Sequence, residues 1–335
     1  MCSLFGFLDY RGIIPHKLAR KLCQSLANSA MERGTDASGI SYVKDGQIVI
    51  YKRPKAANKL RFNPPEGTRA VMGHTRLSTQ GSEKNNQNNH PFYGETPDIS
   101  WSLAHNGCLY NDASLRKEKK LPDTNIETDS YIAVQLIESQ GRLDFDSLRY
   151  MAEAVHGNFT FSLLDENNSL YFVKGSNPLC LLHFADIGLY VYASTESIMK
   201  NALKRVGLHK FAFERIEADD GDIIKIDSSG NITRSQFRPA PNYTSFTRCK
   251  WWYGDYDDYY SACEQTLIDM AHCFGVDEND VILLMDYGYT VDEVEELMMD
   301  ADALKEAVRE IKFTDGEYLY ENCCGCYQER CYGDL

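Results

Sequence analysis

Apolar positions in the first 240 residues fall mostly in short runs of β-branched and aromatic side chains, separated by turn-forming Asn, Gly and Asp residues. Runs of this kind predict strands of one or two antiparallel sheets. The runs are QIVIY, RAVMG, FTFSLL, SLYFVKG, CLLHF, GLYVYAS and DGDIIKID. Apolar residues at helical spacing occur in HKLARKLCQSLANSAME, ETDSYIAVQLIESQ and FDSLRYMAEAVH. Because these strands and helices do not alternate regularly, the pattern predicts an α+β layered domain over residues 2–240.

The pattern changes in the last part of the chain. Residues 241–255 are rich in aromatic and turn-forming residues and are predicted to be a linker. Residues 256–312 show helical spacing only, with a capping box formed by Thr290 and Glu293, and predict a small all-helical domain. A Tyr-Gly-Tyr turn between two of its short helices is similar to that of ubiquitin-associated-type three-helix domains, and a generic acidic helical hairpin is the alternative.

Residues 313–335 form a cysteine-rich tail that contains Cys323, Cys324, Cys326 and Cys331. Structural zinc sites usually use pairs of cysteines spaced by two to four residues on two separate turns, and this spacing does not provide them. The sequence therefore predicts that the end of this tail, ENCCGCYQERCYGDL at residues 321–335, is a redox-sensitive terminus without ordered structure and binds no metal.

The composition narrows the classes of partner. The chain has 335 residues, 43% of them hydrophobic, and a net charge of −14, which suits a globular protein with one large and one small domain. Nucleic acids and anionic membranes require basic surface, so neither is a predicted partner. No run reaches the roughly 18 apolar residues of a membrane helix, and the first residues do not resemble a signal peptide. With 11 scattered cysteines, these features predict a cytoplasmic protein with reduced thiols.

Candidate chemistry begins with the opening sequence MCSLFGF. Removal of Met1 would leave Cys2 with a thiol and a free α-amine on one residue. An α-amine has a pKa near about 7.7–8.0, so at neutral pH it can act as a base beside the nucleophile. A cysteine at the second position is otherwise ordinary, and only further motifs give it a role.

Five further stretches are rich in residues with special chemistry. They are RGTDASG, GHTRLST, NNHPF, AHNGCLYN and ETDSY. Each alone has a structural interpretation: Asn106-Gly107 is a common hairpin turn, Asp129 can support the N-terminus of a helix, and the histidines can be satisfied polar groups.

In this order behind Cys2, the motifs resemble those of class II glutamine amidotransferase domains, the glutaminase units of glucosamine-phosphate synthase, the purine amidotransferase, asparagine synthetase and glutamate synthase. The resemblance covers about residues 2–240 and extends to GNFTFSLLDENNSLYFVKGSNPLCL and YASTES. It implies the four-layer αββα sandwich of N-terminal-nucleophile hydrolases, which agrees with the α+β pattern. It also implies glutamine as the substrate and no cofactor.

The resemblance implies a role for each site residue. Cys2 would attack the side-chain amide of glutamine, and its α-amine would carry the proton to the departing ammonia. Asn106 and Gly107 would form the oxyanion hole. Four further residues are predicted to contact the substrate: Arg76 at its α-carboxylate, Asp129 at its α-ammonium, and His74 and Thr79 near Arg76.

The sequence departs from the family in two respects. Leu77 and Gln80 stand where the family's sugar-phosphate synthases have a Trp and a His. About ninety-five residues follow residue 240, fewer than a fused ammonia-consuming synthase domain needs. Three hypotheses follow: a glutaminase that passes ammonia to a separate synthase through residues 256–312, a stand-alone amidohydrolase of a γ-glutamyl amide, and a non-catalytic binding module. The complete set of site residues argues against the third, and the first is predicted.

Overall fold

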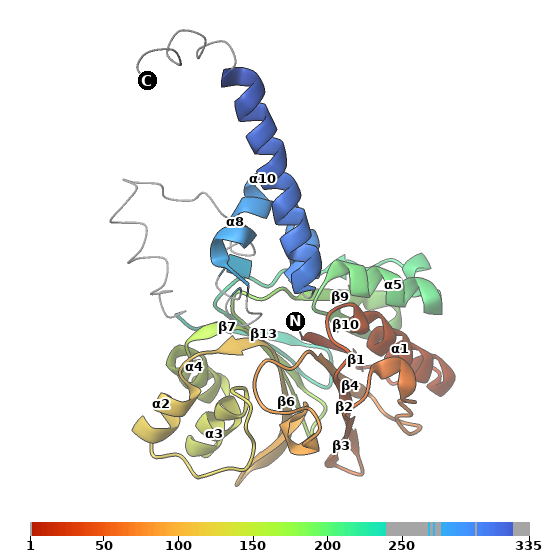
Figure 1. The fold of residues 1–335 in the computed structure, drawn as a ribbon. Helices are drawn as coiled ribbons and strands as arrows, with labels where there is room; N and C mark the ends of the chain where they lie inside the picture. The colour runs from red at the N-terminus through yellow and green to blue at the C-terminus, as the bar shows by residue number, and fades with distance from the viewer. Residues whose placement is uncertain (1, 239–266, 269–270, 272–275, 299, 324–335) are drawn as a thin grey trace, which may run out of the picture. The chain divides into compact units, whose positions relative to one another are not determined.

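The computed structural model describes residues 2–238, 267–268, 271, 276–298 and 300–323 (Figure 1). Contacts between residues divide the chain into two units, Met1–Asp257 and Asp258–Leu335. The predicted linker at residues 241–255 and the end of the predicted tail at residues 324–335 lie outside the described residues. Their assignments stay predictions.

Two antiparallel sheets form the centre of the first unit. A seven-stranded sheet has the order β11-β9-β10-β1-β4-β2-β3, and a six-stranded sheet has the order β13-β12-β8-β7-β6-β5. The strands of the first sheet are β1 (Ser3–Asp9), β2 (Ala37–Lys44), β3 (Gln47–Arg53), β4 (Ala70–Arg76), β9 (Cys180–Phe184), β10 (Leu189–Ala193) and β11 (Glu214–Arg215). Those of the second are β5 (Phe92–Thr96), β6 (Ile99–Leu109), β7 (Gly157–Asp165), β8 (Leu170–Lys174), β12 (Asp222–Ile226) and β13 (Ile232–Gln236).

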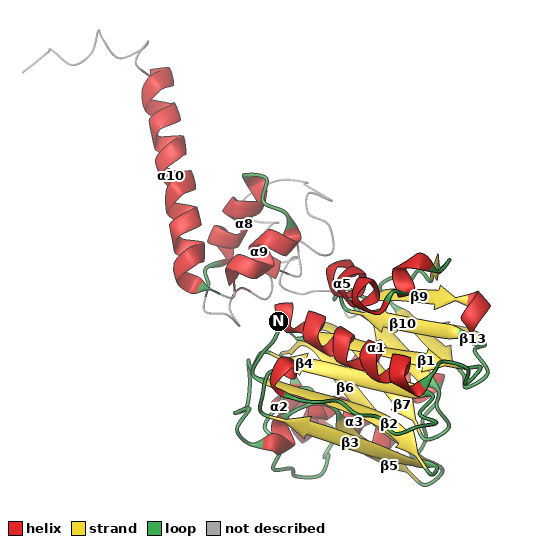
Figure 2. Ribbon diagram, turned by 90° about the vertical axis from the view of Figure 1, so that its right-hand side faces the viewer, coloured by secondary structure: helices red, strands yellow, loops and turns green. Residues whose placement is uncertain are grey.

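Helices cover the outer face of each sheet (Figures 1 and 2). The seven-stranded sheet carries α1 (His16–Ser29) and α5 (Glu196–Val206), and the six-stranded sheet carries α2 (Asp112–Glu118), α3 (Tyr131–Ser139) and α4 (Phe145–Ala154). This arrangement confirms the predicted four-layer αββα sandwich.

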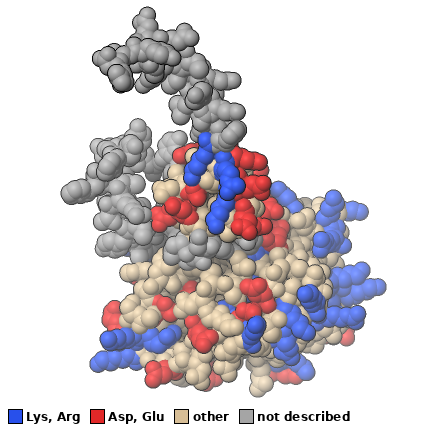
Figure 3. Space-filling view, viewed as in Figure 1, with Lys and Arg blue, Asp and Glu red and all other residues tan. Residues whose placement is uncertain are grey.

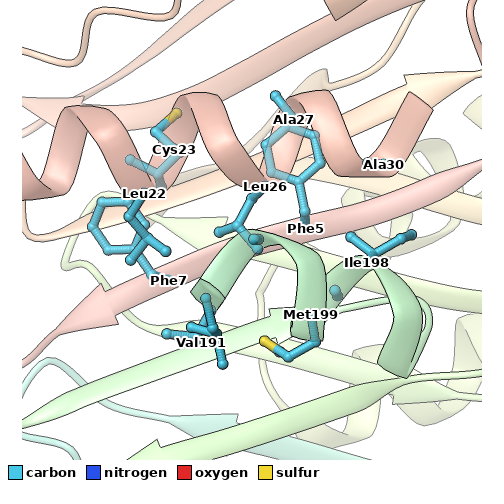
Figure 4. Close-up of a cluster of buried hydrophobic side chains, with 14 of the residues drawn as sticks. Phe5, Phe7, Leu22, Cys23, Leu26, Ala27, Ala30, Val191, Ile198 and Met199 are labelled. Carbon is cyan, nitrogen blue, oxygen red and sulfur yellow. The ribbon is translucent and has the colours of Figure 1, made fainter. Parts of the chain in front are cut away.

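The alternation of side chains along β1 shows how the layers hold together. Phe5 and Phe7 pack into the cluster beneath α1 and α5, where Leu22 and Leu26 of α1 lie over them (Figure 4). Leu4 and Leu8, on either side of this pair, point to the opposite face and belong to the cluster between the two sheets. Every residue of β1 is buried, and since successive strand residues point to opposite faces, the strand is covered on both faces.

The predicted elements of this unit occur where the pattern indicated, but the prediction did not include the helices α2 and α5 or the strands β1, β2, β5, β6, β11 and β13. Of these, α5 is the longer helix. Its boundaries carry ordinary signals, because the Thr195 hydroxyl accepts a hydrogen bond from Ile198 N and Gly207 ends the helix with a φ of 81°. The apolar face of α5 consists of Ile198, Met199, Ala202 and Leu203. This short stripe closely follows GLYVYAS, the run predicted to be a strand.

The described part of the second unit is helical, with α8 (Glu278–Asp286), α9 (Val291–Met298) and α10 (Ala301–Cys323). The predicted capping box is confirmed: Thr290 N donates to Glu293 Oε2 at 2.8 Å, and Glu293 N donates to Thr290 Oγ1 at 3.4 Å. α10 continues through residue 323, so the expectation of a terminus without ordered structure is wrong for residues 321–323, and residues 324–335 lie outside the described part of the chain. The α10 sequence has no Pro, and one Gly costs a helix only about 1 kcal/mol. The similarity to ubiquitin-associated-type domains stays a prediction.

Candidate active site

Cys2 is the residue before β1, whose first residue, Ser3, pairs with Thr75 of β4. This pairing brings Cys2 to the loop after β4, where its Sγ donates a hydrogen bond to the Leu77 carbonyl at 3.5 Å. Arg33, which follows α1 in the chain, also contacts Cys2: its Nε donates a hydrogen bond to the Cys2 carbonyl at 3.1 Å. The motifs RGTDASG and GHTRLST therefore meet at Cys2.

The charges of Arg76 and Asp129 act on the Cys2 thiol. Burial raises the pKa of the thiol, the Arg76 guanidinium lowers that pKa, and the Asp129 carboxylate raises it. The hydrogen bond to the Leu77 carbonyl also lowers the pKa of the thiol. The net upward shift of the pKa keeps the thiol protonated at neutral pH.

Arg76 ends β4 and is buried, with its guanidinium held by the chain that follows. Nη1 donates to Asn89 Oδ1 at 2.8 Å, and Nη2 donates to the carbonyls of Gln80 and Gly81 at 2.6 and 2.8 Å. Within the described residues, the Nε–H and one Nη1–H have no partner. Arg76 therefore keeps two donors for an anionic ligand.

Asp129 lies just before α3, but its carboxylate does not cap that helix. Asp129 Oδ2 accepts a hydrogen bond from Leu109 N at 2.6 Å, and Oδ1 accepts one from Ser130 Oγ at 3.3 Å. Burial raises the pKa of Asp129 to about 6, while the hydrogen bond from Leu109 N acts in the opposite direction. The carboxylate thus connects the start of α3 to the end of β6, which is the strand of Asn106 and Gly107.

Asn106 and Gly107 lie within β6 and do not form a hairpin turn. They pair with Thr160 and Phe159 of β7. Gly107 has a φ of 141°, and a Cβ at this position would lie 1.8 Å from the Asn158 carbonyl oxygen, so the backbone here requires glycine. The Asn106 side chain is fully buried, and its Nδ2 lies 3.5 Å from Ser194 Oγ.

The predicted substrate-contacting residues His74 and Thr79 are both connected to β6. His74 Nε2 is hydrogen bonded to the His105 carbonyl at 2.9 Å, and Cys108 Sγ donates to Thr79 Oγ1 at 3.7 Å. His105 and Cys108 flank Asn106 and Gly107 in sequence. Burial lowers the pKa of both His74 and His105 to about 3, so both imidazoles are neutral at pH 7.

Contacts of the predicted site residues with one another's sequence neighbours thus link the start of β1, the end of β4 with its following loop, the start of α3 and the end of β6. Sequence reasoning missed two side chains that contact them, Ser194 and Asn177. Both lie in stretches that carry the family resemblance, but no feature of their residue type singles them out. Among the described residues no group of three or more His, Cys, Asp or Glu side chains could hold a metal ion. None of the described helices is long and apolar enough to cross a membrane.

Comparison with known proteins assigns the family. Residues 65–225 match the family model described as a glutamine amidotransferase domain. The chain carries a class II glutamine amidotransferase domain.

Two relatives of this amidotransferase domain are glutamine–fructose-6-phosphate aminotransferases (isomerizing). That of Staphylococcus aureus strain Mu50 is 28% identical over 249 residues, which cover 68% of this chain and 39% of the relative. That of Staphylococcus epidermidis strain ATCC 35984 is 30% identical over 189 residues, which cover 53% of this chain and 30% of the relative. The chain therefore spans less than half the length of these relatives.

A solved structure shares the fold of the amidotransferase domain. The glutamine phosphoribosylpyrophosphate amidotransferase of B. subtilis, complexed with ADP and GMP, matches with a TM-score of 0.55 and 21% identity. The match covers 71% of this chain and 49% of that chain.

Proposed function

We propose that this protein hydrolyses the side-chain amide of glutamine and releases glutamate and ammonia, with Cys2 as an N-terminal nucleophile and a separate synthase as the consumer of the ammonia. The observation that carries the proposal is that the buried Arg76 guanidinium and Asp129 carboxylate both act on the Cys2 thiol, while Ser194 contacts both the Asn106 amide and Leu4 N in the strand that follows Cys2. These groups match the charges of free glutamine and the charge of its tetrahedral intermediate.

The reaction balances with water as the only second substrate. The Cys2 sulfur forms a bond to the amide carbon, and the thiol proton passes to the amide nitrogen as the carbon–nitrogen bond breaks. Ammonia leaves, and a thioester remains. Water then attacks the thioester carbon, so that glutamate forms and the thiol is restored. Asn106 Nδ2 and the Gly107 N–H would stabilise the oxyanion in both steps.

The proton in the first step needs an acceptor, because burial keeps the Cys2 thiol neutral. His74 and His105 are poor acceptors, since a pKa of about 3 leaves them with little affinity for a proton at pH 7. The α-amine of Cys2 suits the task by its ordinary pKa and by its position on the nucleophile itself. This argument requires that Met1 is removed.

The proposal is tested by turnover and by labelling. Purified protein should release ammonia from glutamine, and Cys2→Ala should abolish that release without changing thermal stability by more than a few tenths of a kcal/mol. A glutamine-like diazo-ketone should label the unsubstituted protein and spare Cys2→Ala. Mass spectrometry of the active protein should find Met1 absent. Full activity with Met1 retained would exclude the α-amine as the base.

The substrate is tested by comparing glutamine with a γ-glutamyl amide that has a larger leaving group. Preference for glutamine, increased by a co-purified partner protein, is the expected result. Faster turnover of the larger amide would assign the protein to the stand-alone hydrolases. If neither amide is turned over and the diazo-ketone does not label Cys2, the protein is a binding module and the enzymatic proposal fails.

A further inference from the structure

We propose that two side chains, Asn177 and Ser194, orient the two donors of the oxyanion hole, Asn177 acting on the Gly107 N–H and Ser194 on the Asn106 amide. Both are positioning residues, because each acts through a donor and neither touches the substrate. The inference rests on the proposed function only in so far as these donors serve catalysis. The orientation itself is a property of the unliganded protein.

The Asn177 side chain holds the peptide that carries the Gly107 N–H. Asn177 Nδ2 donates a hydrogen bond to the Asn106 carbonyl at 2.8 Å, and both residues are fully buried. The carbonyl of Asn106 and the N–H of Gly107 belong to one planar trans peptide, in which they point in opposite directions. A bond that fixes the carbonyl therefore fixes the direction of the N–H. The same bond polarises the peptide and strengthens its N–H as a donor.

The backbone of Asn177 is itself held by two hydrogen bonds. Its carbonyl accepts a hydrogen bond from Thr160 Oγ1 at 2.6 Å, and its N–H donates to the Phe159 carbonyl at 3.4 Å. Thr160 and Phe159 are the β7 partners of Asn106 and Gly107. Asn177 is thus hydrogen bonded to the same two β7 residues that pair with the donor peptide, which limits the relative motion of the anchor and the donor.

Ser194 acts on the other donor from the opposite sheet. Its Oγ accepts a hydrogen bond from Leu4 N at 2.8 Å and lies 3.5 Å from Asn106 Nδ2, while Ser194 N donates to the Leu4 carbonyl at 3.0 Å. Leu4 is two residues from Cys2 along β1. The Ser194 hydroxyl therefore connects β1, the strand that follows Cys2, to the Asn106 amide that would bind the oxyanion. Catalytic hydrogen bonds that are long without substrate commonly shorten in the reactive complex.

A matched control exists elsewhere in the same interface. Ser41 of β2 and Ser102 of β6 also join the two sheets through buried hydroxyls, 2.7 Å apart, with no contact to the site residues. Ser41→Ala removes a hydroxyl contact between the same two sheets, as Ser194→Ala does. Any effect on stability common to both variants belongs to the sheet interface. An effect on kcat confined to Ser194→Ala belongs to Asn106.

The kinetic experiment measures kcat and KM for glutamine in Asn177→Leu, Asn177→Ala, Ser194→Ala and Ser41→Ala. Asn177→Leu nearly keeps the side-chain volume and removes the donor. We expect kcat to fall roughly tenfold or more in the Asn177 and Ser194 variants, with KM changed little, because misaligned donors act only on the transition state. Ser41→Ala should keep the kcat of the unsubstituted protein. A fall in thermal stability alone, or a rise in KM alone, would overturn the inference.

A second set of variants separates the effect of Asn177 on the Gly107 N–H from the effect of Ser194 on the Asn106 amide. In an Asn106→Ala background, Ser194→Ala should lower kcat no further, because the donor on which it acts is gone. Asn177→Leu should lower kcat in that background by the same factor as before, since its donor is the Gly107 N–H. Equal further losses from both substitutions would contradict the assignment of one anchor to each donor.

A spectroscopic measurement tests the orientation without turnover. The Gly107 amide resonance in the ¹H–¹⁵N spectrum should shift in Asn177→Leu and stay in place in Ser41→Ala. If glutamine is not hydrolysed but this shift occurs, the proposed function fails and the anchoring stands. If glutamine is hydrolysed and neither the resonance nor kcat responds to Asn177→Leu or Asn177→Ala, the anchoring fails and the proposed function stands.

Discussion

The ionisable side chains around Cys2 are almost all buried, and burial decides which of them exchange protons near neutral pH. Burial raises the pKa of the Cys2 thiol and lowers the pKa of His74 and His105 to about 3. Asp129 differs, because its pKa of about 6 falls within the range in which enzymes are assayed. A pH profile of the reaction therefore reports on Asp129 near pH 6, below the range of about 7.7–8.0 in which the Cys2 α-amine titrates.

We predict that kcat/KM for glutamine falls as the pH decreases through about 6, because protonation of Asp129 removes the negative charge that would bind the α-ammonium. Asp129→Asn should give a low kcat/KM without this acidic limb. Glutaramate, which is glutamine without its α-amine, provides the control and should show no such limb with the unsubstituted protein. An identical limb for glutaramate would assign the pKa to another group.

Gly107 permits a prediction that separates backbone strain from steric contact. Gly107→Ala would bring a Cβ to 1.8 Å from the Asn158 carbonyl oxygen, which the strand cannot accommodate, so we expect kcat to fall by roughly a hundredfold or more. Gly46→Ala is the control, since Gly46 also has a positive φ, of 73°, but nothing lies within 4 Å of its Cβ position. That variant should lose about 1 kcal/mol of stability and no activity. Comparable kcat values for the two variants would contradict this account.

At the scale of elements, the strands with unbroken apolar runs and the order of the motifs could be predicted, whereas the strands interrupted by polar motif residues and the contacts between motifs could not. Cys2 precedes β1 and Arg76 ends β4, and antiparallel pairing brings these two strand ends together. The interpretation of Asn106-Gly107 as a hairpin turn is wrong, because β6 continues to Leu109 and the φ of Gly107 serves close packing against β7. The sequence Asn-Gly alone does not reveal whether its glycine forms a turn or allows the close approach of a neighbouring strand.

The departures from the family at Leu77 and Gln80 have a structural explanation at this scale. The Leu77 carbonyl accepts the hydrogen bond from Cys2, and the Gln80 carbonyl accepts one from Arg76. Both residues thus serve the site through the backbone, which tolerates different side chains. Asn177 and Ser194 show the opposite case, since their side chains make the contacts and sequence alone did not single them out.

The helix layer over β1 gives a prediction about stability. Leu26 of α1 is fully buried in the cluster with Phe5 and Phe7 (Figure 4), so Leu26→Ala should lower the free energy of unfolding by about 2–5 kcal/mol. Lys21→Ala on the exposed face of α1 is the control and should stay within about 0.5 kcal/mol. Urea unfolding of the two variants measures the difference. Equal midpoints would contradict the role of this cluster.

At the scale of the whole molecule, surface charge and buried charge have different consequences. Lys and Arg side chains gather on the side of the first unit where α1 and α5 lie (Figure 3), and α1 exposes Lys17, Arg20 and Lys21. Exposed charges are screened by salt and contribute little to stability. Buried groups with shifted pKa values determine instead how stability depends on pH.

Acid should destabilise the protein through its buried histidines. In the unfolded chain a histidine binds a proton below about pH 6.5, whereas folded His74 and His105 do so only near pH 3. The two histidines therefore make their full contribution to the free energy of unfolding above about pH 6.5. This contribution is lost as the pH falls toward 3, and the loss is about 2 kcal/mol for each histidine at pH 5. Asp129 acts in the opposite direction, because its raised pKa favours the folded state by about 1 kcal/mol at pH 5.

His90 offers a direct test of the prediction that buried histidines destabilise the folded protein in acid. Its ring lies 4.2 Å from that of His74 and 4.4 Å from that of Phe92, and neither of its buried nitrogens has a partner among the described residues. Burial lowers its pKa far below the ordinary value, so protonation in acid occurs in the unfolded chain alone. His90→Phe keeps an aromatic ring at this position and cannot be protonated.

We therefore predict that the loss of unfolding free energy between pH 7.5 and pH 5 is smaller in His90→Phe than in the unsubstituted protein by about 2 kcal/mol. The exposed His209 provides the control, because His209→Phe removes an imidazole without removing a buried one and should leave the loss unchanged. Urea titrations at the two pH values measure both differences. Equal losses in His90→Phe and the unsubstituted protein would mean that His90 binds its proton in the folded state, contrary to the burial that surrounds it.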